Sequence, residues 1–343
     1  MSAGKRRYIH IGYPKSASTT IQNMFLCNHP SLYHLGNGFQ GRNNTYADEG
    51  IEWVSETVLR YRKEFLYDPV ATREPFLDHF KIAEENDQYK AVGMSSEFFC
   101  FTLGQEIDVA TKARRLYDIF GDNTCIIFVF REQFSLLRSL HLEMIRGGYY
   151  GSFRKFAEYT YLFQDRNWCT DFCYDKIFEL YAGLFGKENV CAVPFEIIKE
   201  SQSEFTKRIC DGIGVEPMEK DLPSLNAGRE DKGFYEYLRR LNEKARHEFG
   251  GAFYEPFTVT RMRTYFHNEL GVAVPNERMM DYSMLMPLGQ GARQLQERNP
   301  LPDIDQSIPK AIEERLEAIY APSNKKLAEL TGLDLEKYKY RMG

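Results

Sequence analysis

The sequence predicts an α/β fold in which a central parallel sheet of four to five strands is flanked by helices and followed by a helical C-terminal lobe. Strand-like segments alternate with helical patterns through the first part of the chain, which is typical of a parallel sheet with crossover helices. The run Thr124–Phe130 is apolar throughout, as expected for a central strand buried on both faces. The segment 8–22 leads from a strand pattern over 8–13 through a tight polar loop into a helix.

Length and charge limit the classes of protein that fit. The 343 residues are 43% hydrophobic and 14% aromatic, enough for one large domain, which we divide into a nucleotide-binding core (1–215) and a helical or irregular lobe packed on it (216–343). The formal net charge of -5 argues against nucleic acid or a highly sulfated polyanion as a partner. Any basic site must therefore be local.

Membrane and metal signals are weak in this sequence. No apolar run approaches the roughly 20 residues of a membrane span, and the polar loop begins so near Met1 that we expect no leader or stem, no membrane partner and a cytoplasmic location. The seven cysteines lie among apolar residues, which fits reduced core thiols. Cys169 and Cys173 have no second pair, so we expect no metal site.

The first candidate site is the loop after the strand 8–13. Pro14 ends the strand, and apolar residues recur at helical spacing from Thr19 onward. Such a loop presents backbone N–H groups at a helix N-terminus, where a phosphate binds well, and Lys15 would add a full charge. The loop residues that would hold the phosphate are Lys15, Ser16, Ala17, Ser18, Thr19 and Thr20. The alternative is an ordinary strand-to-helix connection with a hydroxyl cap and a solvent-facing lysine.

The second candidate is Glu97, at the end of the next strand. Two helical patterns, split at Asp68-Pro69, fill 51–85, and the segment 90–96 then reads as a strand that ends on this glutamate. Ligands bind at the carboxyl ends of strands in open α/β sheets, and the aromatic residues that follow Glu97 favour desolvation and hence a better base. The alternative is a glutamate that stabilises a helix N-terminus through the helix dipole.

The third candidate is Arg131, which follows the strand 124–130 after a helix over 105–120. A helix over 133–145 comes next, and Ser139 lies eight positions beyond the arginine, a little over two helical turns. The two side chains could share one anion. A P-loop kinase normally places an Asp here to help hold Mg²⁺, and an arginine suits a second phosphate better.

The remaining segments predict packing more than chemistry. The aromatic region 149–186 is mostly core, with 147–163 as a possible acceptor surface, and a strand over 189–196 and helices through 210 and over 232–249 follow. Periodicity fades over 250–305, which indicates an irregular lobe or lid. Helices over 308–319 and from Tyr320 onward end the chain, and we expect this end to dock on the core.

These motifs resemble those of sulfotransferases that use 3′-phosphoadenosine 5′-phosphosulfate (PAPS). The loop of Lys15 is similar to their 5′-phosphosulfate loop, and Arg131 with Ser139 looks like their 3′-phosphate motif. The segment 224–229 resembles one that bacterial-type members place near the nucleotide, so Asn226 and Arg229 would contact the cofactor, although an ordinary helix cap fits equally. The resemblance implies a P-loop NTPase-like fold and a soluble, metal-independent enzyme.

The resemblance also implies a reaction. A sulfuryl group would pass from PAPS to a hydroxyl or amine of a small-molecule, lipid or simple glycan acceptor, leaving adenosine 3′,5′-bisphosphate. Lys15 would lie against the bridging oxygen and Glu97 would deprotonate the acceptor, with His34 or His141 as alternative bases. The alternatives are a P-loop kinase acting on a small molecule and a noncatalytic nucleotide-binding module. Acceptor identity and oligomeric state are not encoded in any motif of this sequence.

Overall fold

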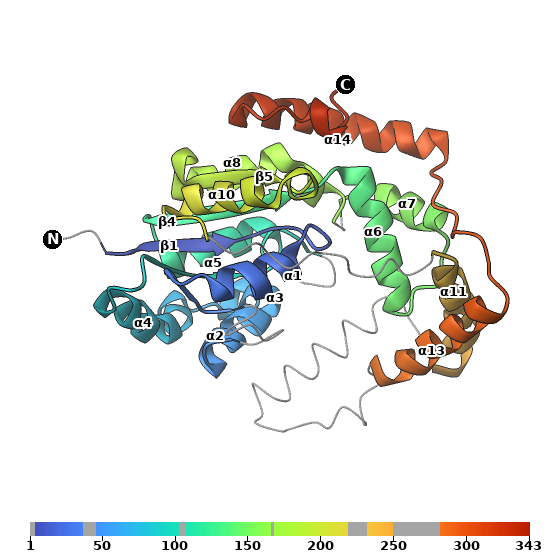
Figure 1. The fold of residues 1–343 in the computed structure, drawn as a ribbon, viewed down its shortest axis with the longest axis horizontal. Coiled ribbons are helices and arrows are strands. Elements are labelled where there is room, and N and C mark those ends of the chain that lie inside the picture. The colour runs from blue at the N-terminus through green and yellow to red at the C-terminus, as the bar shows by residue number, and fades with distance from the viewer. Residues whose placement is uncertain (1–3, 37–45, 103–106, 166–167, 219–231, 250–281) are drawn as a thin grey trace. The chain divides into compact units, whose positions relative to one another are not determined.

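The computed structural model in Figure 1 describes residues 4–36, 46–102, 107–165, 168–218, 232–249 and 282–343. The chain divides into two compact units, each of which is described by itself below. The first unit comprises 1–133, 167–224 and 317–343, and the second comprises 134–166 and 225–316. The boundary near residue 215 between a core and a lobe stays a prediction.

A five-stranded parallel sheet forms the centre of the first unit (Figure 1). Its strands are β1 (Arg6–His10), β2 (Leu32–His34), β3 (Ala91–Ser95), β4 (Thr124–Phe130) and β5 (Val190–Pro194), in the order β2-β3-β1-β4-β5. Every pairing is parallel, and the register sets His10 opposite Ser95 on one side and Ile127 on the other. The predicted α/β class with four to five parallel strands is confirmed.

The helices occupy most of the segments where helical patterns were predicted. The longer ones in the first unit are α4 (Pro69–Glu85), α5 (Val109–Phe120), α8 (Tyr174–Phe185) and α10 (Gln202–Ile213). Shorter turns are α1 (Ser18–Thr20), η1 (Ile21–Phe25), η2 (Leu26–Asn28), α2 (Glu49–Trp53), η4 (Val54–Val58), α3 (Leu59–Tyr61), η5 (Glu64–Leu66), η6 (Thr170–Phe172), η7 (Lys187–Asn189), α9 (Ile197–Glu200) and η10 (Glu336–Tyr338). The predicted break at Asp68-Pro69 is confirmed, because Asp68 caps α4 and accepts hydrogen bonds from Val70 and Ala71.

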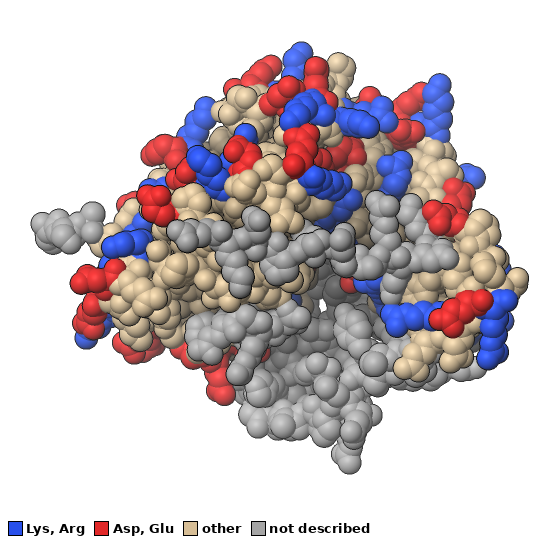
Figure 2. Space-filling view, viewed as in Figure 1, with Lys and Arg blue, Asp and Glu red and all other residues tan. Residues whose placement is uncertain are grey.

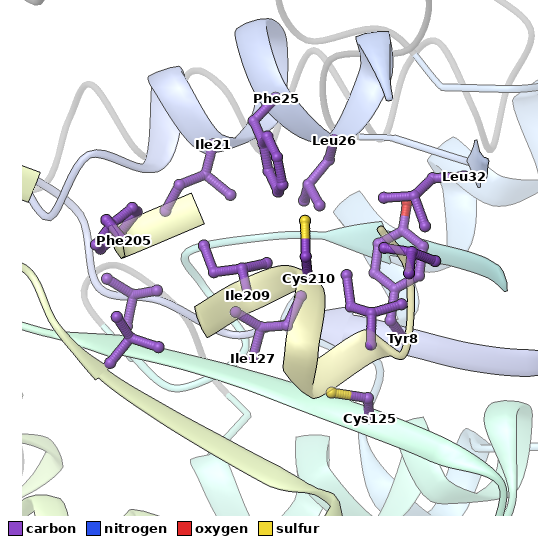
Figure 3. Packing of buried hydrophobic residues seen from close by; sticks show 14 of the residues in the cluster. Tyr8, Ile21, Phe25, Leu26, Leu32, Cys125, Ile127, Phe205, Ile209 and Cys210 are labelled. Carbon is purple, nitrogen blue, oxygen red and sulfur yellow. The ribbon is translucent and has the colours of Figure 1, made fainter. Parts of the chain in front are cut away.

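One face of the sheet is sealed by the helical segment 18–28 together with α10. Figure 3 shows Phe25 and Leu26 from the first and Ile209 and Cys210 from the second pointing toward one another above strand residues such as Ile127. All five side chains are at most 1% exposed. Burial of this apolar surface fixes the helix that follows the loop of Lys15, and so fixes the loop itself.

Aromatic packing covers the other face of the sheet. Tyr13, at the end of the β1 segment, has its ring 5.1 Å from Tyr174 of α8 and 6.0 Å from Phe128 of β4, measured between ring centroids. The buried face of α5 packs on α8 and α4. These aromatic residues pack against this face of the sheet near the carboxyl ends of its strands.

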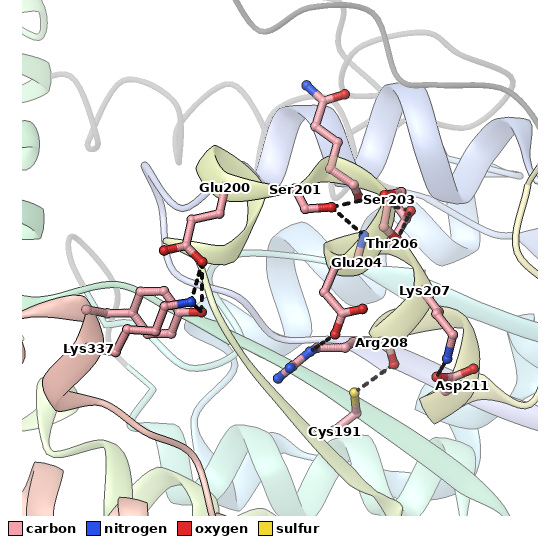
Figure 4. A network of polar contacts seen from close by, with 12 residues as sticks. Cys191, Glu200, Ser201, Ser203, Glu204, Thr206, Lys207, Arg208, Asp211 and Lys337 are labelled. Carbon is pink, nitrogen blue, oxygen red and sulfur yellow. Dashed lines mark hydrogen bonds and ion pairs between the residues drawn. The ribbon is translucent and has the colours of Figure 1, made fainter.

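The C-terminal segment docks on the first unit, as predicted. Figure 4 shows Lys337 beside Glu200, with Nζ 2.6 Å from Oε2, and Tyr340 donates a hydrogen bond of 2.9 Å to Glu196. Figure 4 also shows the ion pairs along α10, Arg208 with Glu204 and Lys207 with Asp211. On the face seen in Figure 2, basic side chains generally lie next to acidic ones.

The second unit contains α7 (Phe153–Leu162), α11 (Lys232–Phe249), α13 (Tyr282–Arg298) and most of α6 (Gln133–Arg146). The helices α11 and α13 lie side by side (Figure 1), and their apolar core includes Phe234, Leu238 and Ala292. The expectation of irregular structure over 250–305 was wrong for 282–298. Packing against α11 stabilises a helix there despite Pro287 and two glycines.

A second correction concerns the chain's last long helix. The two helices predicted over 308–319 and from Tyr320 are one, α14 (Lys310–Thr331), with Pro322 inside it. Tyr320, Asn324 and Leu327 are buried at helical spacing, so one continuous face holds the helix together across the proline. None of the described helices has the length and apolar character that crossing a membrane would require.

Candidate functional site

The loop after β1 has the backbone shape of an anion cradle. Lys15 and Ala17 both adopt left-handed conformations, with φ of 63° and 65°, which turns the chain sharply before the helix begins at Ser18. Ala17 occupies the N-cap position and has no polar side chain, so the first N–H groups of the helix are left for another acceptor. Ser16 is buried, and its Oγ has no hydrogen-bond partner among the described residues.

The strand order places a topological switch point at this loop. The chain leaves β1 toward β2 and leaves β4 toward β5, which lie on opposite sides of β1. Where neighbouring parallel strands connect in opposite directions, their carboxyl ends leave room for a ligand. Glu97 follows β3 and Arg131 follows β4, so the two residues flank the loop of Lys15 from the two strands that pair with β1.

The structure brings Ser18 and Glu97 into direct contact. The Ser18 hydroxyl donates a hydrogen bond of 2.5 Å to Oε2 of Glu97. Ser18 is 5% exposed and Glu97 is half-buried, so the contact is largely shielded from water. A candidate phosphate ligand and the candidate base therefore share one hydrogen bond, which is charge-assisted when the carboxylate is ionised.

Arg131 supports the loop from the opposite side. Its Nη1 donates to the carbonyl of Lys15 at 2.8 Å, and its guanidinium lies 4.9 Å from the ring centroid of Phe195. Tyr174 donates to the carbonyl of Arg131 at 2.5 Å, which holds the backbone at the end of β4. Burial lowers the pKa of Arg131 and nearby Glu196 opposes that effect, so the guanidinium stays charged.

A buried polar network behind Glu97 was not predicted. Lys112 of α5 is fully buried, and its Nζ donates to the carbonyls of Phe98 and Phe101 at 2.9 and 3.0 Å. Asp171 accepts hydrogen bonds from the backbone and hydroxyl of Thr102 at 2.9 and 2.6 Å. Burial lowers the pKa of Lys112 to about 7 and raises that of Asp171. The network holds the segment that follows Glu97.

The sequence carries a signal for this network. Lys112 falls among the apolar positions of α5 and lies on its buried face, between Val109 and Leu116 in the chain. A lysine on an apolar helix face is rare, because burying its charge requires several hydrogen-bond acceptors. Such a position could have been recognised from the sequence as one that holds a loop.

Three histidines are buried, and each lies within hydrogen-bonding distance of another group. His10 of β1, which was not among the predicted residues, lies 2.7 Å from the Ser95 hydroxyl through Nδ1, and burial lowers its pKa to about 3. His34, an alternative base, lies 2.8 Å from the Tyr8 hydroxyl. His141, the other alternative, belongs to the second unit, where its Nε2 lies 3.0 Å from the carbonyl of Gly151 and burial lowers its pKa to about 4.

The other predicted residues are placed as follows. Thr19 is exposed and Thr20 is buried, one on each side of the first turn of the helix. Ser139 lies on α6 in the second unit, whereas Arg131 belongs to the first, so their shared contact with an anion stays a prediction. Asn226 and Arg229 lie outside the described residues.

Comparisons with known proteins were made by sequence and by fold. No protein-family model and no curated protein matches the chain. A sulfotransferase structure from Alicyclobacillus acidocaldarius is similar at 17% identity and a TM-score of 0.44, covering 78% of this chain and 97% of that one. The sulfotransferase domain from the curacin biosynthetic pathway is similar at 15% identity and a TM-score of 0.38, covering 80% and 100% of the two chains.

Proposed function

We propose that this protein is a sulfotransferase that moves a sulfuryl group from PAPS to a hydroxyl or amine of a small-molecule, lipid or simple glycan acceptor. The observation that carries the proposal is the 2.5 Å hydrogen bond from Ser18 to Glu97. Through this hydrogen bond, the Glu97 carboxylate directly contacts a loop whose backbone conformation suits a phosphate. A base beside a phosphate-binding loop suits the transfer of a group from a phosphate-bearing donor to a hydroxyl acceptor.

The residues at this switch point have complementary roles. The backbone N–H groups after Ala17, with the hydroxyls of Ser18 and Thr20, suit the 5′-phosphate, and the orphaned Oγ of Ser16 fits an additional acceptor. When bound, PAPS supplies a sulfuryl group whose bond to the 5′-phosphate oxygen is the one that breaks. Lys15 offsets the charge that develops on that oxygen, and Glu97 takes the proton of the acceptor as its oxygen or nitrogen bonds to sulfur.

Arg131 favours this reaction over the kinase alternative. Kinases of the P-loop class usually place a carboxylate at the end of the corresponding strand to help hold Mg²⁺. This chain places a charged guanidinium there, tied to the phosphate loop through the Lys15 carbonyl. A guanidinium has further N–H donors that suit a second phosphate, as in a nucleotide with a 3′-phosphate.

The test is calorimetric titration in EDTA with adenosine 3′,5′-bisphosphate, with 5′-AMP and ATP as comparators. We expect tight binding of the bisphosphate and much weaker binding of 5′-AMP, because the second nucleotide lacks the 3′-phosphate. A preference for ATP that needs added magnesium would support the kinase instead. Binding of PAPS without any sulfate release would indicate a noncatalytic module.

A further inference from the structure

We propose that Ser18 positions Glu97 through its hydrogen bond in the nucleotide-free protein and donates that hydrogen bond to the donor phosphate when the loop is occupied. Nucleotide binding would then change the protonation of Glu97. This inference rests on the proposed function and couples the binding of the donor to the basicity of Glu97. Ser18 would act as a positioning residue for the base as well as a ligand of the donor.

The coupling follows from the chemistry of one hydroxyl. Ser18 has a single hydrogen to donate, and in this structure it goes to Oε2 of Glu97 at 2.5 Å. The same residue is the first of the helix that opens the phosphate loop, where a bound phosphate would compete for that hydrogen. One donor cannot serve two anions fully, so the phosphate and the carboxylate compete.

A cationic side chain interacts with Glu97 before nucleotide arrives. Arg60 of α3 packs its guanidinium 4.1 Å from the ring centroid of Phe98, the residue next to Glu97, and pairs with Glu56 at 2.8 Å. Burial acts to lower the pKa of Arg60, but Glu56, Tyr46 and Glu97 together raise it, so a cation faces this carboxylate.

Two further polar groups hold the neighbours of Glu97 in place. Lys112 of α5 lies behind the segment, bound to the carbonyl of Phe98. Tyr46 donates a hydrogen bond of 2.5 Å to Glu56 and so keeps that second carboxylate oriented toward Arg60. Nucleotide would bring two changes to Glu97, the loss of the Ser18 donor and the arrival of negative charge in the loop.

Both changes act in the same direction. Losing a hydrogen-bond donor and gaining a nearby anion each make a carboxylate hold a proton more tightly. Glu97 would therefore become a stronger base when the donor is bound, and nucleotide binding would be accompanied by proton uptake at mildly acidic pH. Glu97 would thus be most basic when the donor is bound and an acceptor can react.

The experiment measures proton uptake during binding of adenosine 3′,5′-bisphosphate. Calorimetric titrations at about pH 6 in two buffers of different ionisation enthalpy give the number of protons taken up per nucleotide. We expect greater uptake by the wild-type protein than by Glu97→Gln, since the variant cannot bind that proton. Subtracting the Glu97→Gln value removes the protonation of the nucleotide's own phosphates.

Variants of the loop test the role of Ser18. Ser18→Ala should bind the bisphosphate about 10-fold more weakly, as expected for one lost hydrogen bond, and should show a smaller proton uptake than wild type. Ser203→Ala is the matched control, because it removes an exposed serine hydroxyl on α10 that belongs to no proposed site, and it should keep the wild-type uptake. The Ser18→Ala comparison also stands alone if Glu97→Gln fails to fold.

The outcomes separate this inference from the proposed function. Tight binding with equal proton uptake in wild type and Glu97→Gln, or in wild type and Ser18→Ala, would overturn the coupling and leave the function standing. No binding of the bisphosphate to the wild-type protein would overturn the proposed function itself.

Discussion

Glu97 is the proposed general base, so its replacement should lower the rate of transfer. Glu97→Gln keeps the size of the side chain and its ability to accept a hydrogen bond from Ser18 but removes the base. We expect sulfuryl transfer to fall by about 10²-fold to 10⁴-fold, the usual contribution of a general base. Affinity for adenosine 3′,5′-bisphosphate, measured by calorimetry, should change little. A variant with the wild-type rate would remove Glu97 from the mechanism.

Arg131 has two possible contributions that one substitution can separate. Arg131→Ala removes the hydrogen bond to the Lys15 carbonyl, which supports the loop, and also the proposed ligand of the 3′-phosphate. A lost charged hydrogen bond costs about 1.5–3 kcal/mol, or roughly 10-fold to 100-fold in affinity. We expect that loss for the bisphosphate and a smaller one for 5′-AMP. Equal losses for both nucleotides would mean that Arg131 supports the loop alone.

At the scale of elements, the helix that carries the loop depends on the core beneath it. Phe25 is 1% exposed and packs between the helical segment 18–28 and α10 (Figure 3). We expect Phe25→Ala to lower the free energy of unfolding by about 3–5 kcal/mol in a urea titration. Phe65→Ala is the matched control, because Phe65 is 84% exposed, and it should cost less than about 0.5 kcal/mol. Similar losses in the two variants would contradict this packing.

The elements also show what a sequence pattern can and cannot reveal. The strand β4 and the helix α11 match their predicted ranges, because a continuous apolar run and a long amphipathic pattern each have one structural solution. The strand β2 has three residues, too few for a pattern, and gains its stability by pairing with β3. The helix α13 was missed because contact with α11 outweighs its proline and glycines.

The candidate site was predictable in its parts and not in its contacts. Glu97 and Arg131 lie within two residues of a strand end and Lys15 lies in the loop after β1, so sequence alone places them at the carboxyl edge of the sheet. The hydrogen bond between Ser18 and Glu97 depends on the register of β1 against β3, which no local pattern encodes. The support from Lys112 depends in the same way on how α5 packs.

For the whole molecule, buried histidines predict acid sensitivity. Burial lowers the pKa of His10 to about 3 and that of His141 to about 4, below the value of roughly 6.5 in an unfolded chain. Between these values the unfolded state binds more protons, so each histidine makes stability fall as pH falls. Asp171 acts oppositely, because burial raises its pKa and its folded form binds the extra proton.

His29, Asp108 and Glu236 add to the effect of the two histidines, because their pKa values are also lowered in the folded protein. Stability should therefore fall as the pH is lowered from 6 to 4. Urea titrations at a series of pH values across this range measure the slope. A stability that is constant or rises on acidification would contradict the assignment of neutral, buried histidines.

The proposed function requires that the residues at the switch point catalyse sulfuryl transfer from PAPS without a metal. The most direct measurement follows sulfate release from PAPS, with water as acceptor, in EDTA and with the wild-type protein. We expect slow release that adenosine 3′,5′-bisphosphate inhibits and that Lys15→Met reduces, because Lys15 offsets the charge on the departing phosphate. Release no faster than that of PAPS in buffer alone, from a protein that binds the bisphosphate tightly, would contradict the claim.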